Sequence, residues 1–146
     1  MSQRDNKEVM LKQVAKNPFN LQCASDRLKN DKDIVLSAME KTNDQRLLQF
    51  AGNQIKDDKD FILLAVSKNG WNLQHASDRL KNDLDVVYQA LIQKEHSHIH
   101  IGDELKEKIG GHDPIKYLET ELHKQQLDRE LAPKTETKQT KQVFKI

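Results

Sequence analysis

The residues that could carry out chemistry are a single cysteine and a few histidines. Cys23 has no second cysteine with which to form a disulfide or a cysteine-rich zinc site. As a nucleophile it would need a base in a defined position, but two similar stretches of the chain carry Phe50 or His75 where it stands. We therefore expect an exposed or structural cysteine and predict no catalytic residue.

Three histidines alternate at His96, His98 and His100, a spacing that suggests a metal site because neutral imidazole is a common ligand. With Ser97 as the N-cap of a helix, only His96 and His100 would share a face, and no nearby cysteine completes a ligand set. We therefore predict no metal and no cofactor. An enzyme would require His75, these histidines and Cys23 to converge in one cleft.

Composition limits the function further. The 146 residues are 36% hydrophobic and 32% charged, which is typical of one small, well-solvated domain. The net charge of +1 makes nucleic acid an unlikely partner, since no excess of cations is available for a phosphate backbone. The chain has no signal-like N-terminus and no apolar run of about 20 residues. These features predict a cytoplasmic protein with no membrane contact.

An internal repeat dominates the sequence. Residues 20–31 and 72–83 are identical except at Cys23 and His75, with an offset of 52 residues, and residues 48–57 are a degenerate copy halfway between them. The second repeat unit has two additional residues around 42–45. We predict a helical-repeat domain over residues 6–109, with units at 6–30, 31–57, 58–82 and 83–108.

Each unit is predicted to contain two short helices. The first begins at an aspartate N-cap such as Asp31, and the second begins at Asn20 or Asn72 and ends in a left-handed conformation at Asn30 or Asn82. Pro18 and Gly70 would break the chain between them, the glycine by allowing positive φ. Such short helices persist only when stacked, so the fold class is all-α, a short α-solenoid. The predicted core comprises Leu21, Ala24, Leu28, Ile34, Val35, Ala38, Leu48, Ala51, Ile55, Ile62, Ala65, Leu73, Ala76, Leu80, Val86, Val87 and Ala90.

A longer helix is predicted over residues 113–132, because Asp113-Pro114 is a typical helix start. Its apolar residues form two opposite sides, Ile115, Leu118 and Leu122 against Tyr117, Leu127 and Leu131. One side can dock on the solenoid. The other is expected to contact a partner or a second copy in a homodimer, the alternative being the tail folding back. Residues 133–146 are predicted to form a flexible polar tail.

Four further residues are candidates for partner binding. Phe19 and Trp71 occupy equivalent places, where each could pack as a hydrophobic staple on Ala24 or Ala76, or serve as an exposed anchor for a partner. Arg27 and Arg79 also recur, either as ion pairs between units or as part of a recognition surface.

The stretches LQCASDRLKNDKDIVLSAM and LQHASDRLKNDLDVVYQAL resemble a bacterial family of tandem helical repeats of unknown function, found among other places in secreted effectors of intracellular pathogens. The resemblance covers about residues 6–108 and implies no catalytic residue. A solenoid offers an extended surface and no group of residues here offers chemistry, so we expect a protein-binding module. By analogy with small proteins of effector arsenals, one role is inhibition of an effector enzyme such as a ubiquitin-modifying deamidase or transglutaminase. The alternative is an effector-type adaptor that binds a host protein, delivered into the host cell by a secretion system. Fold alone does not decide between these roles.

Overall fold

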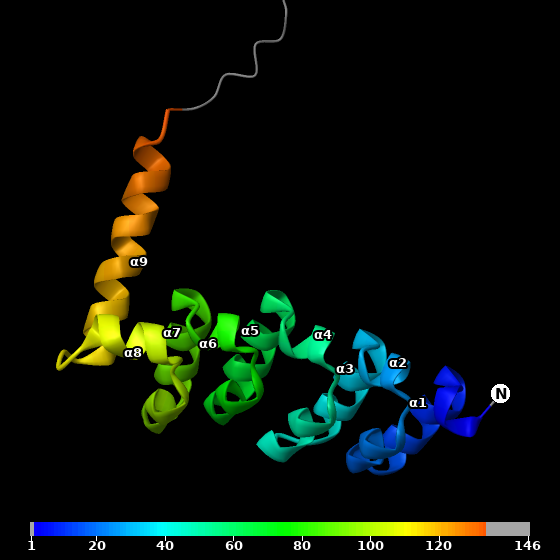
Figure 1. Ribbon diagram of the computed structural model, residues 1–146. Helices are drawn as coiled ribbons and strands as arrows, with labels where there is room; N and C mark the ends of the chain where they lie inside the picture. The colour runs from blue at the N-terminus through cyan, green and yellow to red at the C-terminus, as the bar shows by residue number, and fades with distance from the viewer. Residues whose placement is uncertain (1, 134–146) are drawn as a thin grey trace, which may run out of the picture.

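The computed structural model describes residues 2–133 and shows a row of stacked helical units, with one long helix rising from the end of the row (Figure 1). Every regular element in this part of the chain is helical, which confirms the all-α prediction. The α-helices are α1 (Lys7–Lys16), α2 (Asp26–Lys29), α3 (Lys32–Lys41), α4 (Asn53–Lys56), α5 (Lys59–Lys68), α6 (Asp78–Lys81), α7 (Leu84–Gln93), α8 (Asp103–Ile109) and α9 (Pro114–Leu131). The 3₁₀ helices are η1 (Gln3–Asp5), η2 (Pro18–Cys23), η3 (Gln45–Phe50), η4 (Gly70–His75) and η5 (Glu95–His100).

Each unit contains three helical segments, so the prediction of two helices per unit is wrong. A first α-helix is followed by a 3₁₀ helix and then by a short α-helix, as in α1, η2 and α2. The extended backbone of Ala24 and Ser25 separates the last two segments, and Ser25 caps the short helix by accepting a hydrogen bond from Leu28 N. The spacing of Leu21, Ala24 and Leu28 is therefore that of one face of an amphipathic helix, but the three residues lie in a 3₁₀ helix, in extended backbone and in a short α-helix.

The first helix of each unit begins where its side chains dictate. Asn6, Asp31, Asp58 and Asp83 each accept hydrogen bonds from backbone N–H groups in the first turn. These caps satisfy donors that would otherwise lack partners at the helix start. All of the predicted core residues are buried, the most exposed being Ala24 and Ala76 at 6%.

The N-caps of η2 and η4 are Asn17 and Asn69, so the assignment of Asn20 and Asn72 as caps is wrong. Asn17 Oδ1 accepts from Phe19 N at 3.0 Å, and Asn69 Oδ1 accepts from Trp71 N at 3.1 Å. The amide of Asn72 instead donates to the Ala65 carbonyl at 2.8 Å, near the end of α5. Asn20 Nδ2 makes the equivalent bond in the first unit. These amides therefore hold each 3₁₀ helix against the preceding α-helix.

Two predictions of left-handed backbone are also wrong. Asn30 and Asn82 have φ of −98° and −105°, and Gly110 is the one residue of the described chain with positive φ. Gly70 is buried and serves a different purpose, because a Cβ on it would overlap the carbonyl oxygen of Ala90 in α7. A glycine is thus needed there for close approach.

Neighbouring units are joined by a repeated backbone hydrogen bond. The N–H of the second residue after each of η2 to η5 donates to a carbonyl of the preceding short helical segment: Ser25 to Arg4, Gly52 to Lys29, Ser77 to Lys56 and Gly102 to Lys81, at 2.8–2.9 Å. Arg4 belongs to η1, so η1 takes the place that a preceding short helix occupies elsewhere in the row.

The side chains at these junctions alternate between two arrangements. At the first and third, a serine and an arginine bind an aspartate: Ser25 Oγ donates to Asp5 at 2.7 Å, and Ser77 Oγ donates to Asp57 at 2.6 Å. At the second and fourth, Gly52 and Gly102 leave room for the amides of Asn30 and Asn82. The alternation explains why the close sequence repeat is 52 residues long while the structural unit is half that length.

We predict that the two arrangements can be exchanged. Gly52→Ser alone should lower the free energy of unfolding by about 1–3 kcal/mol, because Asn30 must abandon its hydrogen bonds to Gln54 N and the Asp26 carbonyl. Adding Asn30→Asp recreates the Asp57–Ser77 pair and should restore about 1 kcal/mol or more, measured as a coupling energy in urea unfolding. Strictly additive effects of the two changes would contradict this prediction.

Lysines at the start of the first helices form a second link between units. Lys7 contacts Asp31 at 2.9 Å, Lys32 contacts Asp58 at 2.6 Å, and Lys59 contacts Asp83 at 3.0 Å. The fourth unit has Leu84 at this position. Leu84 packs against the core beside Tyr117 of α9, so the series of ion pairs ends where the long helix covers the row.

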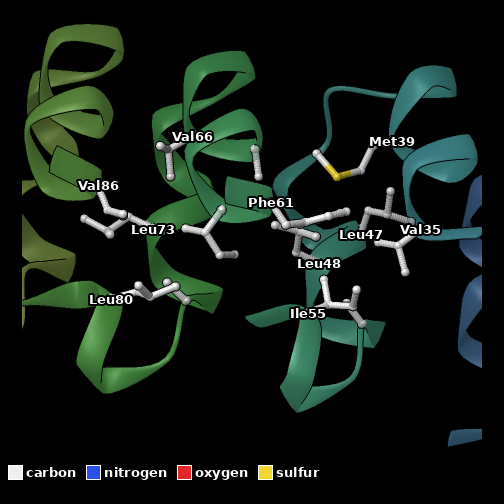
Figure 2. Packing of buried hydrophobic residues seen from close by; sticks show 14 of the residues in the cluster. Val35, Met39, Leu47, Leu48, Ile55, Phe61, Val66, Leu73, Leu80 and Val86 are labelled. Atoms are coloured by element: carbon white, nitrogen blue, oxygen red, sulfur yellow. The ribbon is translucent and has the colours of Figure 1, made fainter. Parts of the chain in front are cut away.

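The junction between the second and third units is wider than its neighbours. Helix α1 packs on α3 and α5 packs on α7, whereas α3 and α5 make sparse contact. The two additional residues lie here, since 42–44 separate α3 from η3 where one residue suffices in the other units. Phe61 extends into this space toward Leu47 and Leu48 (Figure 2). Its large ring occupies the place of Ile34 and Val86 in neighbouring units.

Candidate protein-binding edge

The four 3₁₀ helices η2 to η5 lie side by side along one edge of the row. In the first three, the cap bond is made to the second residue of the 3₁₀ helix: Phe19, Arg46 and Trp71. The cap therefore fixes the backbone of the same half-buried or exposed residue in each unit. In η5 the equivalent cap is Lys94, which makes no side-chain cap bond.

Side chains on this edge pack from one unit to the next. The rings of Phe19 and Phe50 meet edge to face at 6.5 Å between centroids, and those of Trp71 and His100 do so at 5.6 Å. Arg46 lies over the Phe19 ring, 5.8 Å from its centroid. We call Phe19, Arg46, Phe50, Trp71 and His100 the aromatic edge. Each ring keeps part of its surface in solvent.

The predicted hydrophobic staple is wrong, because Asn20 and Asn72 do not cap helices. Phe19 and Trp71 pack across the unit boundary on Phe50 and His100. Amphipathic aromatic side chains that are held by a neighbour and still half-exposed are common anchors at protein interfaces, because little conformational entropy is lost on binding. The alternative interpretation of Trp71 as an anchor stays open.

Two grooves lie beside the aromatic edge at equivalent places in successive units. One, of about 530 Å³, is lined by Phe50 with Asp26 and Lys29, and the next, of about 550 Å³, is lined by His75 with Lys56 and Asp78. Each groove therefore combines a ring, a cation and an acid. The ring and the lysine recur at equivalent places along the row, whereas the acid comes from the preceding unit in the first groove and from the unit of the ring in the second.

His75 is a half-buried histidine whose Nε2 has no hydrogen-bond partner. Burial, together with the nearby Lys56 ammonium, lowers the pKa of His75 to about 4, although a bond to the Gln45 backbone acts in the opposite direction. The ring is therefore neutral near pH 7. Burial also lowers the pKa of His100, with Lys81 and Lys106 nearby.

This pKa predicts acid sensitivity. Between about pH 6.5 and 4 the unfolded chain binds a proton at His75 that the folded protein does not, so the free energy of unfolding should fall as the pH drops through this range. For a partly exposed ring we expect a loss of about 1–2 kcal/mol. His75→Phe, which copies Phe50, should reduce this slope in urea unfolding and leave the part that His100 and the paired aspartates contribute, while His96→Phe, a change at an exposed residue, should keep the whole slope. An unchanged slope in His75→Phe would contradict the assignment.

The candidate chemical groups lie in separate units. Cys23 is exposed in η2, and His75 holds the equivalent place two units further along in η4. His96 and His98 are exposed, and His98 Nδ1 lies 3.0 Å from the Glu95 carbonyl. Ser97, expected as an N-cap, is fully buried inside η5. Over residues 2–133, no group of three histidine, cysteine or acidic side chains is placed to hold a metal ion.

Arg27 and Arg79 bind within the chain. Arg27 Nε donates to Asp5 Oδ1 at 3.0 Å and Nη2 donates to the Asp5 carbonyl at 2.7 Å. Arg79 makes the same two bonds to Asp57. Both side chains are about 60% exposed, but their guanidinium groups already fasten one unit to the next.

Helix α9 is divided along its length rather than into two faces. Its first half packs on α7, with Leu118 buried and both Ile115 and Tyr117 against the core. The placement of Tyr117 on an outward-facing side is therefore wrong. The second half extends beyond the row (Figure 1), and its residues Leu127 and Leu131 are 42% and 80% exposed. The proposed contact with residues 134–146 lies outside the described residues.

Self-association through α9 stays a prediction, now confined to this projecting half. Replacing Leu127 and Leu131 together by glutamate should lower the mass in solution if two copies meet there, because exposed leucines are the apolar surface that such a contact would bury. Light scattering across a concentration series measures this. Unchanged mass and unchanged partner affinity would contradict the prediction.

Sequence reasoning missed Arg46, Phe50 and His100 as members of the edge. Each could have been found from the repeat register, since Arg46 aligns with Phe19 and Trp71, and both Phe50 and His100 align with His75. What the register does not show is that the 3₁₀ conformation brings the two positions of adjacent units together.

No helix in residues 2–133 combines the length and hydropathy that a membrane span requires. No curated protein and no solved structure matches the chain. The family model described as Domain of unknown function (DUF4116) matches residues 6–56, 41–73 and 58–106. The first and last of these matches each span two structural units, which agrees with the alternating junctions. The chain therefore belongs to the DUF4116 family of domains of unknown function.

Proposed function

We propose that this protein is a non-enzymatic protein-interaction module that binds its partner along the aromatic edge. The observation that carries the proposal is the row of rings held in place across unit boundaries, Phe19 on Phe50 and Trp71 on His100, each with part of its surface in solvent. Solenoids use such extended surfaces for binding, and tryptophan is enriched among residues that dominate binding energy.

Regulation of the partner is the more specific form of this proposal. The role of an inhibitor or regulator of a bacterial effector enzyme, or of an adaptor that binds a host protein, rests on the resemblance of the repeats alone. Both roles use the same physical property, an extended surface that occupies a partner without transforming it. They differ in whether the partner's own activity falls when the complex forms.

Affinity capture tests the proposal. The full chain should recover a protein partner from cytosol or host lysate, and Trp71→Ala should lose it, because removal of the indole removes the anchor. Leu64→Ala, a change at a residue 43% exposed on α5, is the control and should keep the partner. Thermal unfolding must show that both variants are folded. A partner held equally by Trp71→Ala, or no partner for the folded wild type, would overturn the proposal.

A further inference from the structure

Although the net charge of the chain is near zero, the row of units has one edge that is negatively charged and another that is positively charged. All the first helices of the units run in the same direction, and each has acids at its start and a lysine at or near its end. At their N-terminal ends seven carboxylates face three lysines, the acids being Glu8, Asp31, Asp33, Asp58, Asp60, Asp83 and Asp85. At their C-terminal ends stand Lys16, Lys41, Lys68 and Lys94.

The lysines at the C-terminal ends are next to the aromatic edge. Phe19 follows Lys16, and Trp71 follows Lys68, by three positions, a chain length of about 10 Å at most. With Arg46, the starts of the 3₁₀ helices have five cations, against the three carboxylates of Glu40, Asp44 and Glu95. The two grooves at the other end of these helices add two lysines and, apart from Asp57 in its ion pair with Arg79, two aspartates, so the excess of positive charge stays the same. Charges of this sign also suit helix C-termini, so the lysines stabilise the fold whether or not a ligand is present.

The two edges differ in how their charges are used. Each lysine of the acidic edge is paired with an aspartate of the next unit, and Asp31, Asp58 and Asp83 also cap helices. None of the four lysines beside the aromatic edge has an ion-pair partner among residues 2–133. Within the described chain, these four cations therefore have no ion pair to lose when a carboxylate binds beside the half-exposed rings.

From this arrangement, and resting on the proposed function, we infer that the aromatic edge binds an acidic, extended segment of another protein, with carboxylates on the lysines and apolar side chains on Phe19 and Trp71.

Nucleic acid fits less well, because Glu40 and Glu95 would repel a backbone that carries charge at every nucleotide. A peptide can place neutral residues opposite them. A second copy of this chain fits less well, because six of the seven carboxylates of its acidic edge, all but Asp60, already pair with a lysine of the same chain. The sequence of residues 134–146 has four lysines and one glutamate, so it too lacks the complementary charge.

The chain contains one tryptophan, so the fluorescence of Trp71 reports directly on this edge. The full chain is titrated with a twelve-residue peptide of glutamate and leucine, with the same peptide carrying lysine for glutamate, and with single-stranded poly-dT. The acidic peptide should give a saturable change whose affinity falls with salt, and the other two probes should not. No change with the acidic peptide, or equal binding of poly-dT, would overturn the inference.

Charge reversal locates the site. Lys41→Glu with Lys68→Glu should weaken binding of the acidic peptide by about tenfold or more. Lys116→Glu with Lys124→Glu makes the same change of charge at exposed positions on α9 and should leave the affinity within about twofold. Equal losses in both variants would overturn the inference, as would a dimer at low salt that the first variant abolishes. If a captured partner is lost in Trp71→Ala but retained in the Lys41 and Lys68 variant, the inference fails and the proposed function stands.

Discussion

Leu80→Ala is expected to lower the free energy of unfolding by about 2–5 kcal/mol. Leu80 is fully buried in α6, among the side chains that connect the short helix of the third unit to the core (Figure 2). The truncation removes apolar contact and leaves a cavity that the surrounding segments fill only in part. Because a small domain has about 5–15 kcal/mol of total stability, a loss of this size is a large fraction of it.

Urea unfolding followed by circular dichroism measures this loss, and Leu64→Ala is its matched control. Both variants remove the same atoms, but Leu64 is 43% exposed, so its truncation should change stability by less than about 0.5 kcal/mol. Equal effects of the two changes would show that α6 does not pack as described. A Leu80→Ala variant that is already unfolded without urea agrees with the prediction at its upper limit.

The repeat is the part of the fold that sequence predicts best. Its period, the aspartate caps of the first helices and the core positions follow from side-chain types alone, because Asp31, Asp58 and Asp83 recur before the same pattern of buried residues. The start of the long helix is predicted equally well by Asp113 and Pro114. In these places local chemistry and tertiary contact favour the same conformation.

The spacing of the apolar residues does not predict the 3₁₀ helices. Leu21, Ala24 and Leu28 are spaced as on one helical face, yet a 3₁₀ turn, an extended linker and a new helix place them in the core. The conformation depends on partners in other segments, such as the Arg4 carbonyl that binds Ser25 N. Such bonds between units leave no periodic signal in the sequence of either unit.

The aromatic edge also has some residues that the sequence predicts and others that only the structure reveals. Phe19 and Trp71 stand out by residue type, but their neighbours Phe50 and His100 come from the next unit and are recognised as partners only in three dimensions. Arg27 and Arg79 stand out equally and bind within the chain. Recurrence at one position therefore indicates that a residue matters to the repeat, without distinguishing a link between units from a surface for a partner.

The linkage between the aromatic edge and the stacking of units can be tested at Gly70, which precedes Trp71. Elsewhere in the row this position holds Pro18, Gln45 or Glu95, so the 3₁₀ helix itself accepts a side chain there. At Gly70, a Cβ would overlap the Ala90 carbonyl oxygen and press on Lys94 and Ser97 of the fourth unit. The obstruction is backbone, which cannot rotate away as the end of a flexible side chain can.

Gly70→Ala is therefore expected to lower the free energy of unfolding by about 2–4 kcal/mol and to shift the fluorescence of Trp71 as η4 is displaced from α7. The sign is diagnostic, because Gly70 lacks positive φ and an unobstructed alanine would stabilise the folded protein by up to about 1 kcal/mol. Gly111→Ala is the control, since its Cβ would meet nothing within 4 Å. It should leave the fluorescence of Trp71 unchanged and should raise the free energy of unfolding by at most about 1 kcal/mol. Stabilisation by Gly70→Ala would show that α7 lies further from η4 than the structure places it, and that the anchoring of Trp71 does not depend on the contact between the third and fourth units.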